Sequence, residues 1–452
     1  MRDFPAKEVW HDYQLHVAQG CLTNSKHIDR HIGGIYPEIV SGGRGAVVTA
    51  YDDRGLKKTY IDYIQGLGAN FFGMGNPMIA NDVQPYLFDA WALSLNSPHE
   101  VIAAMSVKEY FPFVDKVKFL KTGSEACTAS LKYARAHTGR DVILTHGYHG
   151  YHDPFVSTLS PAIGVPIDHN VKVFSNLDQI TKEVAAVIVE PVIIDWSDER
   201  MDFLKQLREK CTETGTVLIF DEVITAFRFS GYGVCNYSGI TPDLLVIGKA
   251  LGGGMALSAV CGKSEIMDQS DVFISTTFAG EVMPLVACAS ALKCLRKYST
   301  MSIKTLWVNG QNFMDKFNTF NKDVQIQGYP TRGSFVGKQS ALHLFFQETA
   351  KAGILFGPSW FYSFDNVEHD EMTLAACFSI LGRISRGEIK LVGKVPTSPF
   401  SAQQRSITND DTERAVERPT EERSKITRRR DRREKESRRI DRARAGETTR
   451  PS

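Results

Sequence analysis

The sequence predicts an α/β protein with a mostly parallel central sheet flanked by helices, followed by a smaller α+β domain near the C-terminus. Short apolar runs alternate with segments of helical periodicity over residues 115–265, which is the pattern of βαβ units. Two of these runs, 216–220 and 244–247, lead almost directly to a charged residue, Asp221 and Lys249 respectively. In open α/β sheets ligands bind outside the carboxyl ends of the strands, so these side chains are candidates for a site.

Length and composition place the chain among globular proteins. It has 452 residues, of which 42% are hydrophobic and 10% aromatic, enough for two or three domains. The net charge of +1 favours no particular partner. The eight cysteines are scattered without a CxxC pair, as expected in a reducing cytosol. The N-terminus lacks the apolar core of a signal peptide and no stretch approaches the length of a membrane span, so we expect a cytoplasmic protein without a membrane partner.

Local patterns predict the individual elements. Apolar runs bounded by turn residues predict strands, and apolar residues at helical spacing predict helices. We expect strands at residues 46–49, 58–64, 117–120, 141–145, 185–189, 216–220 and 244–247, and helices at 78–95, 98–110, 126–137, 201–214, 284–297 and 370–386.

The lysine and the carboxylate at the sheet rim suit a charged heterocyclic cofactor. A lysine forms a Schiff base with an aldehyde, and a buried acid holds a pyridinium nitrogen protonated. Pyridoxal phosphate chemistry requires both groups. Taken alone, the acidic pair Asp221-Glu222 is often only a strand end, and the glycines at 252–254 are often only a loop, so neighbouring motifs must decide.

Two segments carry a family resemblance. FDEVITAFRF at 220–229 and GKALGGGM at 248–255 resemble the cofactor segments of class III (fold-type I) aminotransferases. The branch that they resemble most is glutamate-1-semialdehyde 2,1-aminomutase. The resemblance runs from about Ser25 to about Gly382, with several motifs in the family's order, and it implies a fold-type I PLP-dependent transferase. It also implies that the helix at 342–353 and the strand after it close the fold.

The resemblance implies roles for the residues around the cofactor ring. Lys249 binds pyridoxal 5'-phosphate, and Asp221 pairs with the nitrogen of its pyridine ring. Tyr148 stacks on one face of the ring with His149 close by, and Val223 packs on the other face. The two residues assigned to catalysis are Lys249 and Asp221.

The phosphate group is expected at the start of the helix that follows residues 117–120. A glycine-serine turn, Gly123-Ser124, places free backbone N–H groups and the positive end of a helix dipole at one point. An ordinary helix cap is the alternative, and the resemblance to the family's phosphate-binding turn favours the ligand. Glu190, at the end of another strand, completes the cofactor-binding set.

A homodimer with shared active sites follows from the segment at 275–280. It resembles the family segment whose threonine, here Thr277, reaches the cofactor phosphate of the neighbouring subunit. A plain loop before the next helix is the alternative.

Three histidines at three-residue spacing, His146, His149 and His152, raise the question of a metal. Tetrahedral zinc needs three or four converging ligands, and no cysteine pair or second histidine cluster completes such a set. We therefore expect no metal.

The domain boundaries are expected as follows: 1–74, an N-terminal arm with a small-domain segment; 75–290, the large cofactor-binding domain; 291–395, the C-terminal small domain; and 396–452, a charged tail. From 401 onward the chain has 16 basic and 11 acidic residues and no aromatic residue. Such a composition predicts disorder, and the interleaved acids weaken any nucleic-acid signal, so nucleic acid is not an expected partner.

The substrate-binding segments depart from the aminomutase branch. That branch has serine-proline-valine-arginine after its N-terminal glycine pair, and the arginine helps to bind the substrate carboxylate. Here Gly33-Gly34 is followed by residues 35–38, which read IYPE, so that arginine is expected to be missing. Leu67 replaces a tryptophan near the substrate, and Ala256 replaces a proline.

These departures favour a class III aminotransferase that moves an amino group from a small-molecule donor to a small carbonyl acceptor. The first alternative is a glutamate-1-semialdehyde 2,1-aminomutase, an isomerase that transfers the amino group within one molecule in tetrapyrrole precursor synthesis. A third hypothesis is a non-catalytic protein that keeps the fold and binds the cofactor or a partner.

Overall fold

A computed structural model describes residues 13–51, 56–89, 91–159, 162–297 and 302–396, all of which belong to one unit that spans 1–404. The charged tail expected at 396–452 lies outside the described residues, apart from its first position. Within the described ranges, every helix is too short or too polar to span a membrane.

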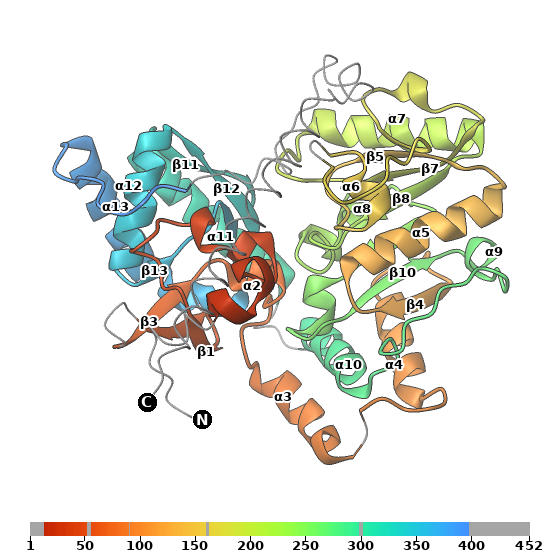
Figure 1. Ribbon diagram of the computed structural model, residues 1–452, viewed down its shortest axis with the longest axis horizontal. Helices are drawn as coiled ribbons and strands as arrows, with labels where there is room; N and C mark the ends of the chain where they lie inside the picture. Colours follow the sequence, from red (N-terminus) through yellow and green to blue (C-terminus); the bar gives the residue numbers. More distant parts are fainter. Residues whose placement is uncertain (1–12, 52–55, 90, 160–161, 298–301, 397–452) are drawn as a thin grey trace, which may run out of the picture. The chain divides into compact units, whose positions relative to one another are not determined.

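A seven-stranded sheet forms the centre of the fold (Figure 1), with the strand order β4-β10-β9-β8-β7-β5-β6. The strands from β9 to β6 run parallel, and β10 pairs antiparallel with both β9 and β4. This mostly parallel sheet confirms the predicted fold class. The strands are β4 (Lys116–Leu120), β5 (Val142–His146), β6 (Val171–Val173), β7 (Val184–Val189), β8 (Val217–Asp221), β9 (Leu244–Ile247) and β10 (Ser258–Gly262).

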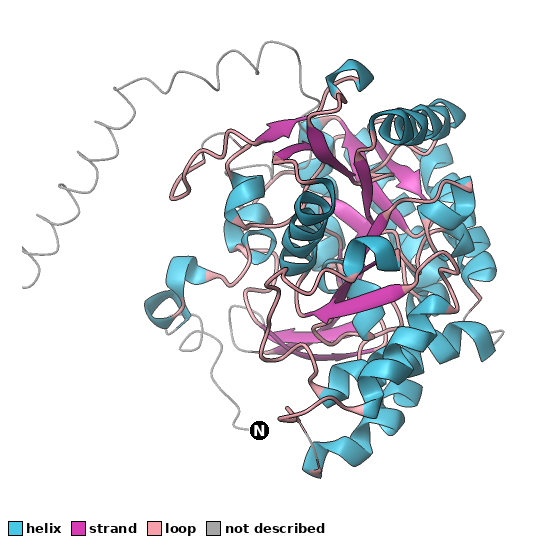
Figure 2. Ribbon diagram, turned by 90° about the vertical axis from the view of Figure 1, so that its right-hand side faces the viewer, coloured by secondary structure: helices cyan, strands magenta, loops and turns pink. Residues whose placement is uncertain are grey.

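Helices cover both faces of this sheet, because its strands are apolar on both sides. Alternate residues of β8 enter different cores: Ile219 belongs to the core that includes α5 and α9, whereas Leu218 and Phe220 belong to the core that includes α4, α7 and α10. Figure 2 shows the strands enclosed between these helices. The helices are α4 (Pro98–Lys108), α5 (Gly123–Thr138), α7 (Asp198–Thr214), α9 (Ser264–Met267) and α10 (Val282–Lys297).

Short elements connect the strands of the seven-stranded sheet. The loop after β5 carries α6, and the segment between β8 and β9 carries η6 and α8; a single 3-10 turn, η7, follows β9. The elements are α6 (Asp153–Val156), η5 (Leu177–Gln179), η6 (Ser230–Tyr232), α8 (Val234–Ser238) and η7 (Lys249–Gly252).

Segments from both ends of the chain form a second region. A four-stranded sheet, β1-β2-β3-β13, joins the N-terminal hairpin to a C-terminal strand, and an antiparallel sheet, β11-β12-β14, lies in the C-terminal part. The strands are β1 (Val40–Arg44), β2 (Val47–Tyr51), β3 (Lys57–Asp62), β11 (Val324–Tyr329), β12 (Arg332–Gly337), β13 (Ile354–Leu355) and β14 (Ser359–Phe361).

Three longer helices pack on these sheets, and short turns lie at the N-terminal side. The helices are α11 (Ile303–Phe320), α12 (Gln339–Lys351) and α13 (Asp370–Ser385), with η9 (Phe364–His369) before the last of them. The N-terminal part contains η1 (Ala18–Gly20), η2 (Asn24–Lys26), η3 (Ile28–Arg30), α2 (Gln65–Gly68), α3 (Pro77–Val83) and η4 (Gln84–Phe88), and residues 13–16 are also helical.

Most expected elements are confirmed within a few residues, and one is wrong. The helix expected at 78–95 ends at Val83, where a 3-10 turn containing Pro85 replaces it, and the described residues from 89 to 97 form no helix. Proline lacks the backbone N–H that an α-helix needs and constrains the residue before it, which explains the early end. The expected elements did not include β1, β6, β10, β11, β12 or β14.

We predict that Gly310→Ala destabilises the second region. An added Cβ at this position of α11 would lie 1.9 Å from the carbonyl oxygen of Pro330, between β11 and β12, so the helix or the turn must shift. Overpacking of this kind costs about 1–3 kcal/mol in the free energy of unfolding, measured by urea titration. The control Lys304→Ala changes an exposed side chain of the same helix and is expected to stay within about 0.5 kcal/mol of the wild type. Equal stability of both variants would contradict the close packing of α11 on this turn.

Candidate active site

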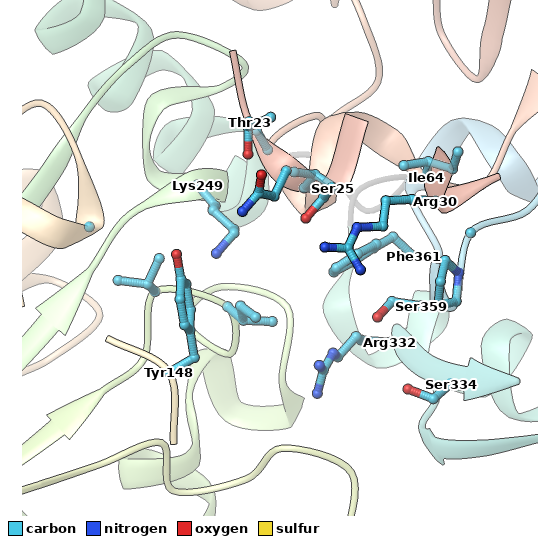
Figure 3. Close-up of a pocket in the computed structure, with 18 of the residues that line it drawn as sticks. Thr23, Ser25, Arg30, Ile64, Tyr148, Lys249, Arg332, Ser334, Ser359 and Phe361 are labelled. Atoms are coloured by element: carbon cyan, nitrogen blue, oxygen red, sulfur yellow. The ribbon is translucent and has the colours of Figure 1, made fainter. Parts of the chain in front are cut away.

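A cavity of about 1160 Å³ lies at the carboxyl ends of β7, β8 and β9. Its large-domain wall includes the N-terminus of α5 and the loop after β5, and its opposite wall comes from residues 19–36, β12 and β14. Figure 3 shows Lys249 and Tyr148 on the first side, and Arg30, Arg332 and Ser359 on the other. Of the nine residues that the sequence singled out, the following eight line this cavity: Gly123, Ser124, Tyr148, His149, Glu190, Asp221, Val223 and Lys249.

Lys249 has an unusual backbone conformation. It follows β9 after Gly248 and opens η7, and its φ angle of +46° lies in the left-handed region that side chains other than glycine rarely occupy. Such conformations persist where the surrounding structure imposes them, and they cluster at functional sites. Burial lowers the pKa of the Lys249 ammonium, while Asp221 and Glu190 act in the opposite direction. An amine with a lowered pKa is a better nucleophile and base near neutral pH.

Three donors orient the Asp221 carboxylate at the end of β8. His149 Nδ1 lies 2.7 Å from Oδ2, the Cys127 thiol donates to the same oxygen at 3.3 Å, and the backbone N–H of Val223 donates to Oδ1 at 3.1 Å. Burial and the nearby Asp221 raise the pKa of the Cys127 thiol, so it remains a donor. The carboxylate is therefore fixed in orientation on the cavity wall, where it can meet a cationic ring nitrogen.

His149 lies behind Asp221 and holds it in place. Its second ring nitrogen, Nε2, lies 3.2 Å from the backbone oxygen of His146. Both ring nitrogens of His149 therefore face hydrogen-bond acceptors. The side chains of His149 and Asp221 are 0% and 4% exposed, which makes this a water-excluded pair.

The three histidines of the loop after β5 do not converge. His149 pairs with Asp221, whereas Nδ1 of His152 lies 2.9 Å from the Thr128 hydroxyl, and the buried Nδ1 atom of His146 has no hydrogen-bond partner among the described residues. Ligand-type atoms of Cys127, His149 and Asp221 do lie within 4.8 Å of one another, but hydrogen bonds account for this cluster.

The start of α5 is built for an anion. Thr122 caps the helix and accepts a hydrogen bond from the backbone N–H of Glu125, while the first two helical amides, Gly123 and Ser124, have no acceptor within the described parts of the chain. The Ser124 hydroxyl accepts a hydrogen bond from the N–H of Tyr151, which leaves its proton free to donate into the cavity. A Cβ at Gly123 would lie 3.2 Å from the Val223 side chain, so glycine permits this close approach.

Glu190 places a second carboxylate at the rim, after β7. Arg200 fixes the backbone there by donating to the oxygens of Glu190 and Pro191 at 3.0 and 2.8 Å. Gly147 faces it, and a Cβ on that glycine would lie 3.1 Å from the Glu190 side chain. Burial raises the pKa of Glu190, and the nearby Asp221 adds to this effect.

Thr277 does not line the cavity; it is exposed in the segment before α10. Its expected role needs a second subunit, and it therefore stays a prediction.

The arginine that the aminomutase branch carries after its glycine pair is absent here, but two other arginines reach the cavity. Arg30, which precedes the glycine pair instead of following it, lines the cavity together with Ser25, and Arg332 lines it from β12 (Figure 3). The sequence comparison did not identify Arg30, because it considered only the residues that follow the glycine pair. Leu67 and Ala256, the two other departures from the branch, also line the cavity.

The profile of the family described as Aminotransferase class-III matches residues 35–360. The chain belongs to this family, and it is accordingly a pyridoxal phosphate-dependent enzyme of the aminotransferase and aminomutase class.

Comparisons with individual proteins give the extent of the similarity in sequence and in fold. The glutamate-1-semialdehyde 2,1-aminomutase of Methylacidiphilum infernorum (isolate V4) is 30% identical over 320 residues, which are 65% of this chain and 72% of that protein. The FumI protein of Sphingopyxis sp. MTA144 shares the fold with a TM-score of 0.76 at 21% identity, covering 85% of this chain and 97% of that one. An omega-transaminase from Sphaerobacter thermophilus gives a TM-score of 0.70 at 23% identity, covering 83% and 98%.

The cavity fits the cofactor that this family implies. It offers an amine, an oriented carboxylate and the open N-terminus of a sixteen-residue helix on one wall, which match the aldehyde, ring nitrogen and phosphate of pyridoxal phosphate. Its volume of about 1160 Å³ leaves room for a substrate besides the cofactor.

We predict that His149→Ala lowers the free energy of unfolding by about 2–3 kcal/mol, because it removes a charged hydrogen bond and leaves a buried carboxylate short of a partner. A double variant also carries Asp221→Asn. Its loss in free energy of unfolding is expected to be smaller, by at least about 1 kcal/mol, than the summed losses of the two single variants, because the two side chains interact directly. Urea unfolding at fixed protein concentration measures the free energy of unfolding of the wild type, the two single variants and the double variant. His169→Ala, at an exposed position, is the control, and strictly additive effects would contradict the pairing.

Proposed function

We propose that this protein is an aminotransferase that moves an amino group from a small-molecule donor to a small carbonyl acceptor, with Lys249 and Asp221 as its catalytic residues. One observation carries the proposal: Lys249, the oriented carboxylate of Asp221 and the open N-terminus of α5 line one cavity. An arrangement retained only for binding would not require a buried lysine whose pKa is lowered.

In this proposal, each residue around the cofactor has its own role. Pyridoxal phosphate, when bound, supplies an aldehyde that condenses with amines and a ring that stabilises negative charge. Lys249 holds the cofactor and, once its amine is released, moves a proton at Nζ. Asp221, held by His149, keeps a proton on the ring nitrogen through a charge-assisted hydrogen bond. Gly123 and Ser124 bind the phosphate.

We predict that Lys249→Ala abolishes covalent attachment of the cofactor and lowers turnover by at least about 10³-fold, because no other described lysine offers an unpaired amine in this cavity. Borohydride reduction followed by peptide mass spectrometry locates the attached cofactor. The control Lys263→Ala removes a partly exposed lysine outside the cavity and is expected to leave attachment intact. Attachment at another residue, or normal turnover without Lys249, would refute the assignment.

The alternative is a glutamate-1-semialdehyde 2,1-aminomutase, which acts within one molecule. The aminomutases at about 30% identity favour it, and so does the position of Arg30 and Ser25 on the cavity wall. Leu67 and Ala256, which replace residues typical of that branch, favour a different substrate. Absorbance spectra separate the two: conversion to the pyridoxamine form by simple amino acids supports transamination, and conversion only by diamino or amino-aldehyde compounds supports the aminomutase. If the purified protein takes up no cofactor, the hypothesis of a non-catalytic protein is favoured instead.

We also propose that two copies of the chain form a homodimer with shared active sites. An apolar surface surrounds the segment of Thr277, and it consists of exposed side chains of residues 87–105 and 273–278: Leu87, Phe88, Trp91, Leu93, Leu95, Val101, Ile102, Met105, Phe273 and Phe278. The chain returns to the first stretch four residues after Phe278, where the N–H of Val282 donates to the backbone oxygen of Trp91 at 2.9 Å. Exposed apolar surface of this extent is typical of an interface.

The segment that follows Thr277 contacts a residue of the cavity. Lys121, which lines the cavity, forms a 2.6 Å ion pair with Glu281, four residues after Thr277. A second copy on the apolar surface would therefore sit beside the phosphate-binding turn, where Thr277 of the partner copy can contribute its hydroxyl.

We predict complementation between two defective subunits. Thr277→Ala weakens cofactor affinity about 5- to 20-fold through the loss of one phosphate hydrogen bond, and Lys249→Ala prevents attachment. A mixed dimer contains one intact site, with Lys249 from one subunit and Thr277 from the other, so at limiting cofactor its occupancy should approach half that of the wild type. If the cofactor occupancy of the mixed dimer is no higher than the mean occupancy of the two parent variants, the active sites are not shared. Sedimentation of Phe88→Asp tests the interface separately, with loss of the dimer expected.

A reducing compartment remains our prediction. All eight cysteines are buried and free, which is the arrangement expected in the cytosol.

A further inference from the structure

Two segments from opposite ends of the described chain meet beside the cavity. Most residues of 19–32, here called the cavity-lining segment, lie on the cavity wall, and Figure 3 shows Arg30 among them. Residues 390–396, here called the C-terminal segment, pass over Ile32 and reach the cavity at Pro396. Both segments lie outside the range that the family profile matches, so membership of the family does not account for their contact.

A backbone bridge connects the two segments. The N–H of Gly33 donates to the oxygen of Lys394 at 2.8 Å, and the N–H of Lys394 donates to the oxygen of Gly33 at 2.9 Å. A Cβ on Gly393 would lie 2.3 Å from the Ile32 side chain, so glycine permits this close approach. Among the described residues, no other hydrogen bond between backbone groups joins residues 19–35 to a distant part of the chain, since the rest close local turns.

The cavity-lining segment has little support of its own. None of the residues from 22 to 31 is buried, and their backbone hydrogen bonds close short 3-10 turns. Only beyond them do Ile32 and Tyr36 enter a small core. Segments with few buried contacts and only local hydrogen bonds open at a low cost in free energy. The position of residues 22–31 on the cavity wall therefore depends on how firmly the chain is held at Gly33.

Gln347, a completely buried residue of α12, holds the C-terminal segment in turn. Its Oε1 accepts hydrogen bonds from the N–H groups of Val392 and Gly393 at 2.8 and 3.0 Å. Its Nε2 donates to the oxygen of Lys390 at 2.9 Å and to Oε1 of Glu348 at 3.0 Å. The amide thus uses its full hydrogen-bonding capacity, and three of its four bonds go to backbone groups of the C-terminal segment.

Hydrogen bonds fix the C-terminal segment more than apolar burial does. Its side chains Leu391, Val392 and Val395 are 41%, 69% and 39% exposed, so they contribute little hydrophobic stabilisation. The segment also forms no helix or strand apart from the bridge at Lys394. Gln347 is therefore the side chain that ties this segment to α12.

We propose that Gln347 is a positioning residue that keeps the cavity-lining segment in place through the C-terminal segment. Gln347 does not itself line the cavity; it fixes the chain around Lys394, and the bridge from Lys394 to Gly33 fixes the cavity-lining segment. This inference rests on the proposed function, because the segment then limits the access of water and small molecules to a reactive cofactor at Lys249.

The first test measures how often the cavity-lining segment opens. Gln347→Met keeps the length of the side chain and removes its hydrogen bonds to the C-terminal segment. Amide hydrogen exchange in peptides that contain Gly33 should become about 10- to 100-fold faster, as measured by mass spectrometry. Gln311→Met is the matched control, because it removes a glutamine of α11 that is bonded to Asp315 outside the cavity, and it should exchange as the wild type does.

The second test measures access to the bound cofactor. Methoxyamine is a small reagent whose nitrogen replaces Nζ of Lys249 on the cofactor aldehyde carbon, and Lys249 leaves as a free amine. Loss of the absorbance of the lysine-bound cofactor gives the rate. Gln347→Met should react at least about 3-fold faster than the wild type at equal cofactor content, because the opened segment admits the reagent.

A disulfide in place of the hydrogen bonds provides a rescue. A Cβ on Gly33 would lie 3.3 Å from Cβ of Lys394, close to the separation that a disulfide requires, and all eight native cysteines are buried. Gly33→Cys and Lys394→Cys, added to Gln347→Met and oxidised, should return both rates to within about 2-fold of the wild type. Reduction with dithiothreitol should abolish the rescue.

Three results would overturn the proposal. One is exchange around Gly33 at the wild-type rate in Gln347→Met. Another is fast exchange that the oxidised disulfide does not slow, which would mean that Gln347 only supports the fold around α12. The third is an unchanged methoxyamine rate in a variant whose exchange is fast. If the protein took up no cofactor, the proposed function would fail, while the exchange rates would still test whether Gln347 holds the segment.

Discussion

The buried hydrogen bond between His149 and Asp221 is the interaction on which the rest of the site depends. A carboxylate at the end of a buried strand is useful to a cationic ring only if it is held in one orientation and kept away from water. His149 Nδ1 at 2.7 Å, the Cys127 thiol and the N–H of Val223 provide that orientation. The loop after β5 must turn back on the sheet to bring His149 there, and the same turn places Tyr148 in the cavity.

The parallel sheet places the other charged residues of the site next to Asp221. Because β7, β8 and β9 are neighbours and run in the same direction, their carboxyl ends deliver Glu190, Asp221 and Lys249 to one rim. The apolar strands behind them pack on helices at both faces, which excludes water from that side. Burial then changes the chemistry: it lowers the pKa of Lys249 and raises that of Glu190, so the amine loses its proton more readily than a solvated lysine would.

The second region forms the opposite wall of the cavity. Apolar side chains such as Leu67, Phe335 and Phe356 make up much of this wall, and Arg30 and Arg332 add positive charge to it. The residues to which we assign cofactor binding and the residues of this wall therefore come from different parts of the chain.

The sequence by itself determined the fold class and the family, and it indicated the residues to which we assign cofactor binding, because those signals are local. The strand before Asp221, the glycine-serine turn at 123–124 and the lysine after β9 are each recognisable within about ten residues. Eight of the nine singled-out residues line one cavity, and Glu190, Asp221 and Lys249 do so because a parallel sheet brings its strand ends together. Local patterns failed where Pro85 ended a helix early.

Only the tertiary structure decided what surrounds those residues. The partners of Asp221, His149 and Cys127, are 72 and 94 residues away from it in the sequence, and no local pattern pairs them. Arg332 reaches the cavity because β12 pairs with β14 in one particular register, which depends on contacts between distant segments. The sequence therefore identified the family and its candidate cofactor residues, while the packing of the two regions decided which charged side chains line the cavity.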